Sequence, residues 1–126
     1  MGFGILLEGM VSSLTHSVSL MNVYGPYKDR DQFWNGVEEA GILRLDSLIL
    51  GGDLTFTLNA REVWGPKASL DSQANFFQNL FEEAGLVDLT PLSMKPTWRN
   101  GWPGSTGIAK RLDTLFITEN LLEGAF

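Results

Sequence analysis

The sequence predicts a layered α/β or α+β domain, because strand-like and helix-like segments alternate along the chain. Residues 17–24 partly alternate between apolar and polar, as a half-buried strand does. Residues 29–43 place apolar side chains at helical spacing, and residues 47–50 are an apolar run closed by two glycines. The length of 126 residues fits one domain or part of one.

Each half of the chain contributes strands and one helix to this prediction. In the first half, strands over 1–7 and 17–24 form a hairpin whose connection contains 12–16. A helix over 29–43, started by Asp29 or Asp31, precedes a strand buried on both faces. After a loop over 53–67, the second half is expected to hold a helix over 71–84, capped by Asp71 or Ser72 and ended by Gly85, then strands over 86–89 and 111–118. Four aromatic side chains are assigned to the core: Trp34, Phe76, Phe77 and Phe81.

Composition excludes several functional classes. The 44% hydrophobic and 19% charged residues are typical of a globular chain and argue against disorder. The absence of Cys excludes disulfides, thiolate catalysis and Cys-based zinc sites. Neither a signal peptide nor an apolar stretch of ~20 residues is present, so we expect no membrane partner and an intracellular location, nuclear or cytoplasmic.

The charge balance gives a nucleic-acid partner no general attraction. The net charge is −6, and the nine basic residues are scattered along the sequence. A nuclease is still compatible with this charge, because a bound cation can bridge a carboxylate cluster to a phosphate. Asp53 is the first candidate, since it follows a buried strand and two glycines, where it either binds a cation or water or caps the turn.

Three ordered segments carry a resemblance to a known family. They are Asn22–Tyr27 with the Phe33-Trp34 helix, Leu50–Thr57, and Arg111–Ile117 preceded by Pro96-Thr97-Trp98. Together they resemble the endonuclease/exonuclease/phosphatase (EEP) domain of plant LINE-type retrotransposons. The resemblance implies a DNase I-like sandwich of two β-sheets flanked by helices. It also implies Mg²⁺-dependent hydrolysis of DNA phosphodiesters, with no small-molecule cofactor.

The resemblance assigns catalytic roles to four residues. Asp53 would hold the cation or the attacking water, and Tyr24 would donate to a phosphate oxygen. Asp113 would orient a catalytic His. Thr55 replaces the Asn of the family's Gly-Asp-x-Asn motif, and its single hydroxyl cannot reproduce the reach of an amide. The alternatives are a Tyr24 at the edge of the core and an Asp113 paired with Arg111.

Three further residues have alternative interpretations. Trp98 would stack on a base and Arg99 would bind a phosphate, unless Trp98 belongs to the core and Arg99 to the surface. Glu62 either lines the cleft or is a solvated loop carboxylate. The single His of the chain, His16, is expected at the surface.

By this resemblance, residues 1–126 are the C-terminal half of an incomplete domain. The first half with its metal-binding Glu, and the final Ser-Asp-His element with the catalytic His, are expected to be missing. The chain alone is therefore expected to be inactive, to bind Mg²⁺ poorly and to self-associate through exposed sheet surface. The alternatives are a decayed fragment without activity and an unrelated α/β binding module, against which the ordered motifs argue.

Overall fold

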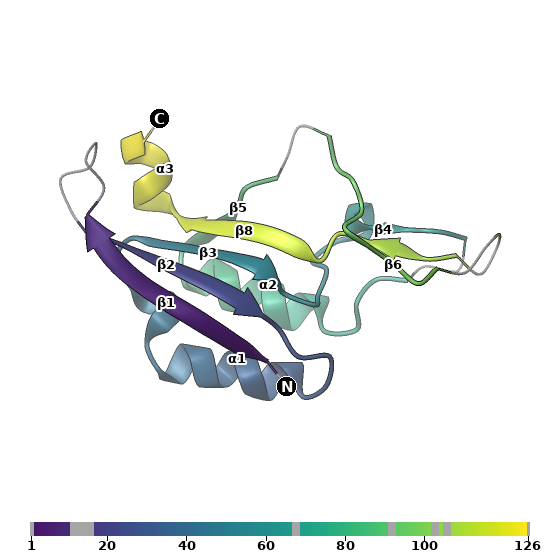
Figure 1. Cartoon of the computed structure of the whole chain (residues 1–126), viewed down its shortest axis with the longest axis horizontal. Helices are drawn as coiled ribbons and strands as arrows, with labels where there is room; N and C mark the ends of the chain where they lie inside the picture. Colours follow the sequence, from purple (N-terminus) through teal and green to yellow (C-terminus); the bar gives the residue numbers. More distant parts are fainter. Residues whose placement is uncertain are drawn as a thin grey trace.

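A five-stranded sheet forms the centre of the protein (Figure 1), whose computed structural model describes residues 2–10, 17–66, 69–90, 93–101, 104 and 107–125. The strand order is β1-β2-β3-β8-β5. Strands β2 and β3 are parallel, and every other neighbouring pair is antiparallel. The bounds are Phe3–Met10 for β1, Ser17–Tyr24 for β2, Leu48–Asp53 for β3, Leu86–Asp88 for β5 and Asp113–Thr118 for β8. The predicted hairpin pairing is confirmed, while its connection at 11–16 lies outside the described residues.

Two helices cover one face of this sheet and a third covers one end of the other face (Figure 1). They are α1 (Arg30–Glu39), α2 (Ala74–Glu83) and α3 (Glu119–Ala125), with 3₁₀ turns η1 (Ile42–Arg44) and η2 (Ala60–Glu62). Helix α1 ends before the predicted residue 43 because Gly41 takes a left-handed φ of 80°. Gly85 ends α2 in the same way, as predicted. No helix among the described residues is both long and apolar enough to cross a bilayer.

A second, three-stranded sheet projects beyond one end of the large sheet (Figure 1). It consists of β4 (Val63–Trp64), β6 (Trp98–Arg99) and β7 (Ala109–Lys110) in the order β4-β7-β6. Each strand has two residues, too few for a hydrophobic period to be detected in the sequence. The mixed α/β class and the two sheets that the sequence predicted are both present.

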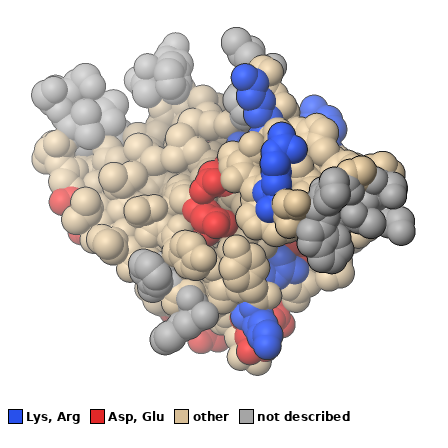
Figure 2. Space-filling view, turned by 45° about the vertical axis from the view of Figure 1, so that its right-hand side comes forward, with Lys and Arg blue, Asp and Glu red and all other residues tan. Residues whose placement is uncertain are grey.

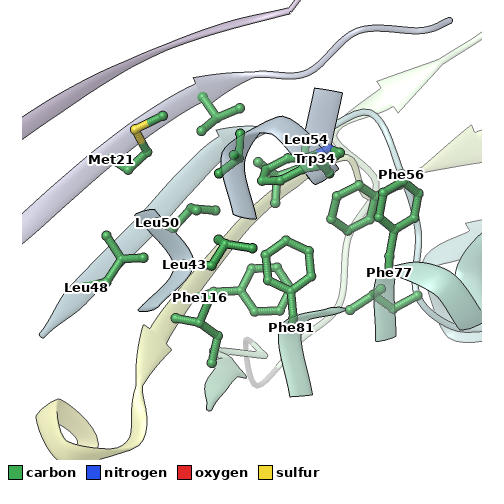
Figure 3. Packing of buried hydrophobic residues seen from close by; sticks show 14 residues of the cluster. Met21, Trp34, Leu43, Leu48, Leu50, Leu54, Phe56, Phe77, Phe81 and Phe116 are labelled. Carbon is green, nitrogen blue, oxygen red and sulfur yellow. The ribbon is translucent and has the colours of Figure 1, made fainter. Parts of the chain in front are cut away.

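Aromatic side chains fill the space between the large sheet and its helices (Figure 3). Trp34 from α1 makes edge-to-face contacts with Phe56 and Phe81, at centroid distances of 5.8 and 5.4 Å. Phe81 stacks on Phe116 of β8 at 4.5 Å, and Phe56 stacks on Phe77 at 4.1 Å. The core assignment is thus confirmed for the aromatic residues, with Phe76 only partly buried.

Strand β3 continues through the two glycines that were expected to close it. Gly51 and Gly52 pair with Leu115 and Thr114 of β8. A Cβ on Gly52, whose φ is 127°, would lie 2.2 Å from the carbonyl oxygen of Val23, so only glycine allows β2 to approach so closely. Asp53 is therefore the last residue of the strand, and its position is fixed by pairing on both sides.

The face of the large sheet opposite α1 and α2 is largely uncovered. The exposed apolar residues there are Ile5, Leu7, Leu20 and Leu115. Helix α3 covers only one end, where Leu121 packs near Val18 and Ile117. The prediction that β3 is buried on both faces is wrong, because Leu48 and Leu50 are fully buried under the helices while Ile49 is only partly covered.

Candidate functional site

Three of the predicted site residues form a row across the large sheet. Tyr24 at the end of β2 is the register partner of Asp53 at the end of β3, and Asp53 is the register partner of Asp113 at the start of β8. Register partners place their side chains on the same face of a sheet. Strand alternation places the row on the same face as the exposed Leu20 and Leu115, which is the uncovered face. The strand ends that carry the row are those nearest the three-stranded sheet (Figure 1). The structure thus brings together residues that are up to 89 positions apart in the sequence (113 − 24).

The row is partly open to solvent and carries two neighbouring negative charges. The Tyr24 side chain is 43% exposed, Asp113 is exposed and Asp53 is half-buried. Burial raises the pKa of Asp53 above its ordinary value. The Thr55 amide N–H, which donates to the Asp53 carboxylate at 3.1 Å, opposes this rise, and the charge of Asp113 adds to it.

Tyr27 joins the row, although the sequence interpretation gave it no role. Tyr27 is 60% exposed, and its pKa is raised by slight desolvation, by the charge of Asp53 and by the electrostatic effect of Tyr24 together with a side-chain hydrogen bond to it. The Gly25-Pro26 turn after β2 brings Tyr27 back beside Tyr24. An aromatic residue directly after a Gly-Pro turn at a strand end was the available signal.

Thr55 does not present its hydroxyl to the row. Thr55 is 6% exposed, and its hydroxyl lies 2.7 Å from the carbonyl oxygen of Pro26 and 2.7 Å from the carbonyl oxygen of Leu54. Its amide N–H contacts Asp53. The hydroxyl that stands in place of the family's Asn amide holds the turn after β3 against the turn after β2.

Trp98 and Arg99 line different hollows, because neighbouring residues of a strand point to opposite faces. Trp98 borders a hollow of about 410 Å³ together with Tyr27, Thr55 and Lys110. The Lys110 ammonium lies 5.9 Å from the Trp98 ring centroid. Arg99 borders a separate hollow beside Trp64. Trp98 lies in the hollow that also contains Tyr27 of the row, whereas Arg99 lies in the other hollow.

Basic residues are concentrated in the segment that carries β6 and β7, although they were expected to be scattered. Residues 89–112 contain four basic and no acidic residues. Lys95, Arg99 and Lys110 are at least partly exposed on or beside the three-stranded sheet, as is Arg61. Figure 2 shows Lys and Arg side chains next to a small acidic patch. A basic surface therefore borders a carboxylate site on a chain of negative net charge.

Glu62 and Arg111 belong to a buried ion-pair network. Glu62 is 1% exposed, and its carboxylate accepts from the backbone N–H groups of Leu58 and Asn59. It lies 3.6 Å from Arg111, which forms a bidentate pair with Asp88 at 3.1 and 3.2 Å. Both expectations for Glu62, a cleft residue or a solvated one, are wrong, and so is the pairing of Arg111 with Asp113.

A magnesium site is only partly represented by these side chains. Asp53 and Asp113 supply hard carboxylate oxygens, which suit a divalent cation. Within the described part of the chain, no three His, Asp or Glu side chains are grouped closely enough to hold a metal ion. Mg²⁺ is commonly held by one or two carboxylates, with waters and substrate phosphates as its other ligands, so Asp53 and Asp113 would supply the protein's share of such a site.

The layered fold and the row at the strand ends place the protein in a structural class. The chain has a DNase I-like fold. Over 95% of its length it matches the solved endonuclease domain of TRAS1, a telomere-specific non-LTR retrotransposon, with a TM-score of 0.66 and 21% sequence identity. It spans 52% of that domain's chain.

A transposon protein shows similarity in sequence as well. The chain is 29% identical over 138 residues to the "Transposon TX1 uncharacterized 149 kDa protein" of Xenopus laevis. The match covers 97% of the present chain and 10% of that protein. No protein-family model matches the chain.

Proposed function

We propose that this chain is part of an EEP-type endonuclease domain of a LINE-type retrotransposon, and that its ancestral reaction is hydrolysis of DNA phosphodiesters. The observation that carries the proposal is the row of Tyr24, Asp53 and Asp113, aligned by strand register. The similarity to two transposon proteins supports it. The assignment to plant LINE elements is part of the proposal and rests on the motif resemblance.

Each member of the row suits one task of phosphodiester hydrolysis. The half-buried Asp53 carboxylate, oriented by the Thr55 N–H, would accept a hydrogen bond from the attacking water. The exposed Tyr24 hydroxyl would donate to a phosphate oxygen. Asp113 would orient an imidazole, and His16, the sole His of the chain, lies outside the described residues. Mg²⁺, when bound, would neutralise charge on the phosphoryl oxygens.

DNA is the substrate that the surroundings of the row favour. The exposed basic residues of the three-stranded sheet would contact backbone phosphates. Trp98, beside Lys110 in the hollow next to Tyr27, offers an aromatic surface for a base. Phosphate contacts on one side and carboxylates on the other would place a phosphodiester across the row.

We further propose that the chain represents the C-terminal half of the domain and is inactive alone. The uncovered apolar face of the large sheet and the coverage of about half of the TRAS1 domain support this proposal. The described residues group two carboxylates at the row without a third carboxylate or an imidazole beside them. Loss of one well-placed catalytic donor costs ~10²–10³-fold in rate, so several missing groups would abolish detectable turnover.

Nicking of supercoiled plasmid with Mg²⁺ or Mn²⁺ tests the inactivity. We expect no nicking by the chain, by Asp53→Ala or by Thr55→Asn, because the Thr55 change restores neither a His nor a third ligand. Nicking by the chain that is lost in Asp53→Ala would contradict the inactivity and establish the row as catalytic.

Binding of labelled duplex DNA in EDTA tests the substrate separately. We expect weak, salt-dependent binding that Lys110→Gln and Trp98→Ala reduce, while Lys28→Gln, an exposed Lys before α1, leaves it unchanged. Equal binding by all three variants would favour the second candidate, a decayed fragment without biochemical activity.

A further inference from the structure

The turn that follows Asp53 has an unusual backbone. Thr55 adopts a φ of 61°, in the left-handed region that β-branched residues avoid. Such a conformation persists only where surrounding contacts enforce it. Every polar group of Thr55 is engaged: its N–H with Asp53, its hydroxyl with the Pro26 carbonyl and its carbonyl with Arg30.

Arg30 is the long-range contact in this set. Its guanidinium donates to the Thr55 carbonyl oxygen at 3.1 Å and lies over the Phe77 ring, 5.4 Å from the centroid. The same guanidinium forms a bidentate pair with Asp71, at 2.6 and 2.7 Å. Its side chain is only 15% exposed, so this ion pair is shielded from water and salt.

Asp71 fixes the other side of Arg30. Its side chain is 8% exposed, and it also accepts from the Gln73 backbone N–H at 2.9 Å. Burial alone would raise the pKa of Asp71, but the hydrogen bonds from Arg30 and from backbone N–H groups outweigh it and lower the pKa. Asp71 is therefore a charged, buried anchor for the guanidinium. Helix α2 begins at Ala74 after Gln73, without a side-chain cap, rather than after the predicted Asp71 or Ser72.

A continuous series of contacts thus links the anchor to the candidate site. Asp71 holds Arg30, Arg30 holds the Thr55 carbonyl, and the Thr55 N–H holds one carboxylate oxygen of Asp53. We infer that Arg30 and Asp71 are positioning residues: they enforce the left-handed turn at Thr55 and thereby set the orientation of the Asp53 carboxylate. The importance of this orientation rests on the proposed function, but the contacts that set it can be tested without nuclease activity.

An ordinary stabilising ion pair would behave differently from a positioning one. Arg44 provides the comparison, because it also donates to a carboxylate, Glu38 at 2.7 Å, and to a carbonyl, Glu83 at 2.8 Å. Neither contact of Arg44 touches the turn at Thr55. Loss of Arg44 should therefore lower stability without a local change at Asp53.

The first test is NMR of the whole chain at a fixed pH of about 8, with Arg30→Met and Arg44→Met. We expect Arg30→Met to speed exchange of the Thr55 amide roughly 3- to 10-fold, the range for loss of a typical hydrogen bond, and to shift the Asp53 carboxyl carbon. Arg30→Lys, which keeps the charge, should recover part of both effects, and Arg44→Met should cause neither. Unchanged Thr55 and Asp53 signals in Arg30→Met would overturn the inference.

The second test is a double-mutant cycle of melting temperatures with Thr55→Gly. Glycine adopts the left-handed conformation without strain, so the turn no longer needs to be enforced. We expect Arg30→Met to lower the melting temperature less in the Thr55→Gly background than in the unchanged protein. Asp71→Asn replaces Arg30→Met if that variant does not fold. Additive effects would contradict the inference, whereas absence of DNA nicking or binding would contradict only the proposed function.

Discussion

Asp53 and Asp113 stand directly opposite each other at the paired ends of β3 and β8. Like charges at opposed positions of an antiparallel pair destabilise a sheet. Such an arrangement costs folding free energy, and proteins retain it where two carboxylates act on one ligand. The same opposition gives a test of the site through stability.

Asp53→Asn should stabilise the protein at neutral pH. Burial raises the pKa of Asp53 in the folded state, so its contribution to stability is present below the unfolded pKa of about 3.9 and is lost as the pH rises through the folded value. Asn is uncharged and its oxygen still accepts from the Thr55 N–H. We expect the melting temperature to rise by a few degrees at pH 7, since each kcal/mol of unfolding free energy corresponds to about 3–5 °C for a chain of this size. The rise should vanish near pH 3.

Asp46→Asn serves as the control for this gain, since Asp46 is an exposed carboxylate outside the row. An equal rise in both variants, measured by thermal unfolding, would show that the effect reflects net charge alone. A rise confined to Asp53→Asn would show that the row itself is electrostatically unfavourable.

Loss of Arg111 should be among the most damaging single changes. Glu62 has a side chain that is 2% exposed and lies beside Arg111, so removing the guanidinium leaves a buried carboxylate without its cation. We expect Arg111→Met to cost about 3–5 kcal/mol in urea unfolding at pH 7. Burial raises the pKa of Glu62, which can take up a proton, so the loss should be smaller at acidic pH.

Glu62→Gln should be milder, because an amide oxygen still accepts from Leu58 and Asn59. When added to Arg111→Met, the Glu62→Gln change should recover part of the stability that Arg111→Met removes. If the two changes were additive, Glu62 and Arg111 would not be coupled.

The uncovered sheet face should cause self-association. Leu7 and Leu20 are register partners on this face, with 60% and 44% of their surface exposed. A few hundred Å² of exposed apolar surface corresponds to several kcal/mol at ~25 cal/mol per Å². We expect oligomers in sedimentation and binding of a hydrophobic dye, and less of both in Leu7→Thr/Leu20→Thr, which keeps β-propensity. Leu70→Thr, which removes an equally exposed Leu away from the sheet, should have no such effect.

Local signals in the sequence predicted the strands of the large sheet, and the family resemblance predicted the row. Residues 17–24 show the period of a strand, and Asp53 follows an apolar run. The ordered motifs then indicated which strands meet. What the sequence did not reveal depends on contacts between distant segments. Glu62 and Arg111 lie 49 positions apart (111 − 62), and their mutual burial leaves no local pattern. Likewise Arg30 meets Thr55 only because α1 packs beside the turn after β3.

Two threonines in this turn should respond in opposite ways to the same substitution. The Thr57 side chain is 1% exposed, and its hydroxyl has no hydrogen-bond partner in the described structure. The Thr55 hydroxyl is hydrogen-bonded to a backbone carbonyl oxygen. Valine has nearly the shape of threonine without the hydroxyl, so Thr57→Val removes only a desolvated polar group and should be neutral or stabilising by about 0.5–1 kcal/mol.

Thr55→Val instead leaves the Pro26 carbonyl oxygen without its donor and frees one side of the strained turn. We expect it to destabilise the protein by about 1–2 kcal/mol in urea unfolding. Threonine and valine are both β-branched, so the left-handed φ at position 55 costs the two side chains a similar amount of free energy. The difference in stability between Thr55→Val and Thr57→Val therefore isolates the contribution of the Thr55 hydroxyl. Equal stabilities of Thr55→Val and Thr57→Val would show that the Thr55 hydroxyl does not hold the turn. In that case Arg30 alone would have to enforce the backbone conformation beside Asp53.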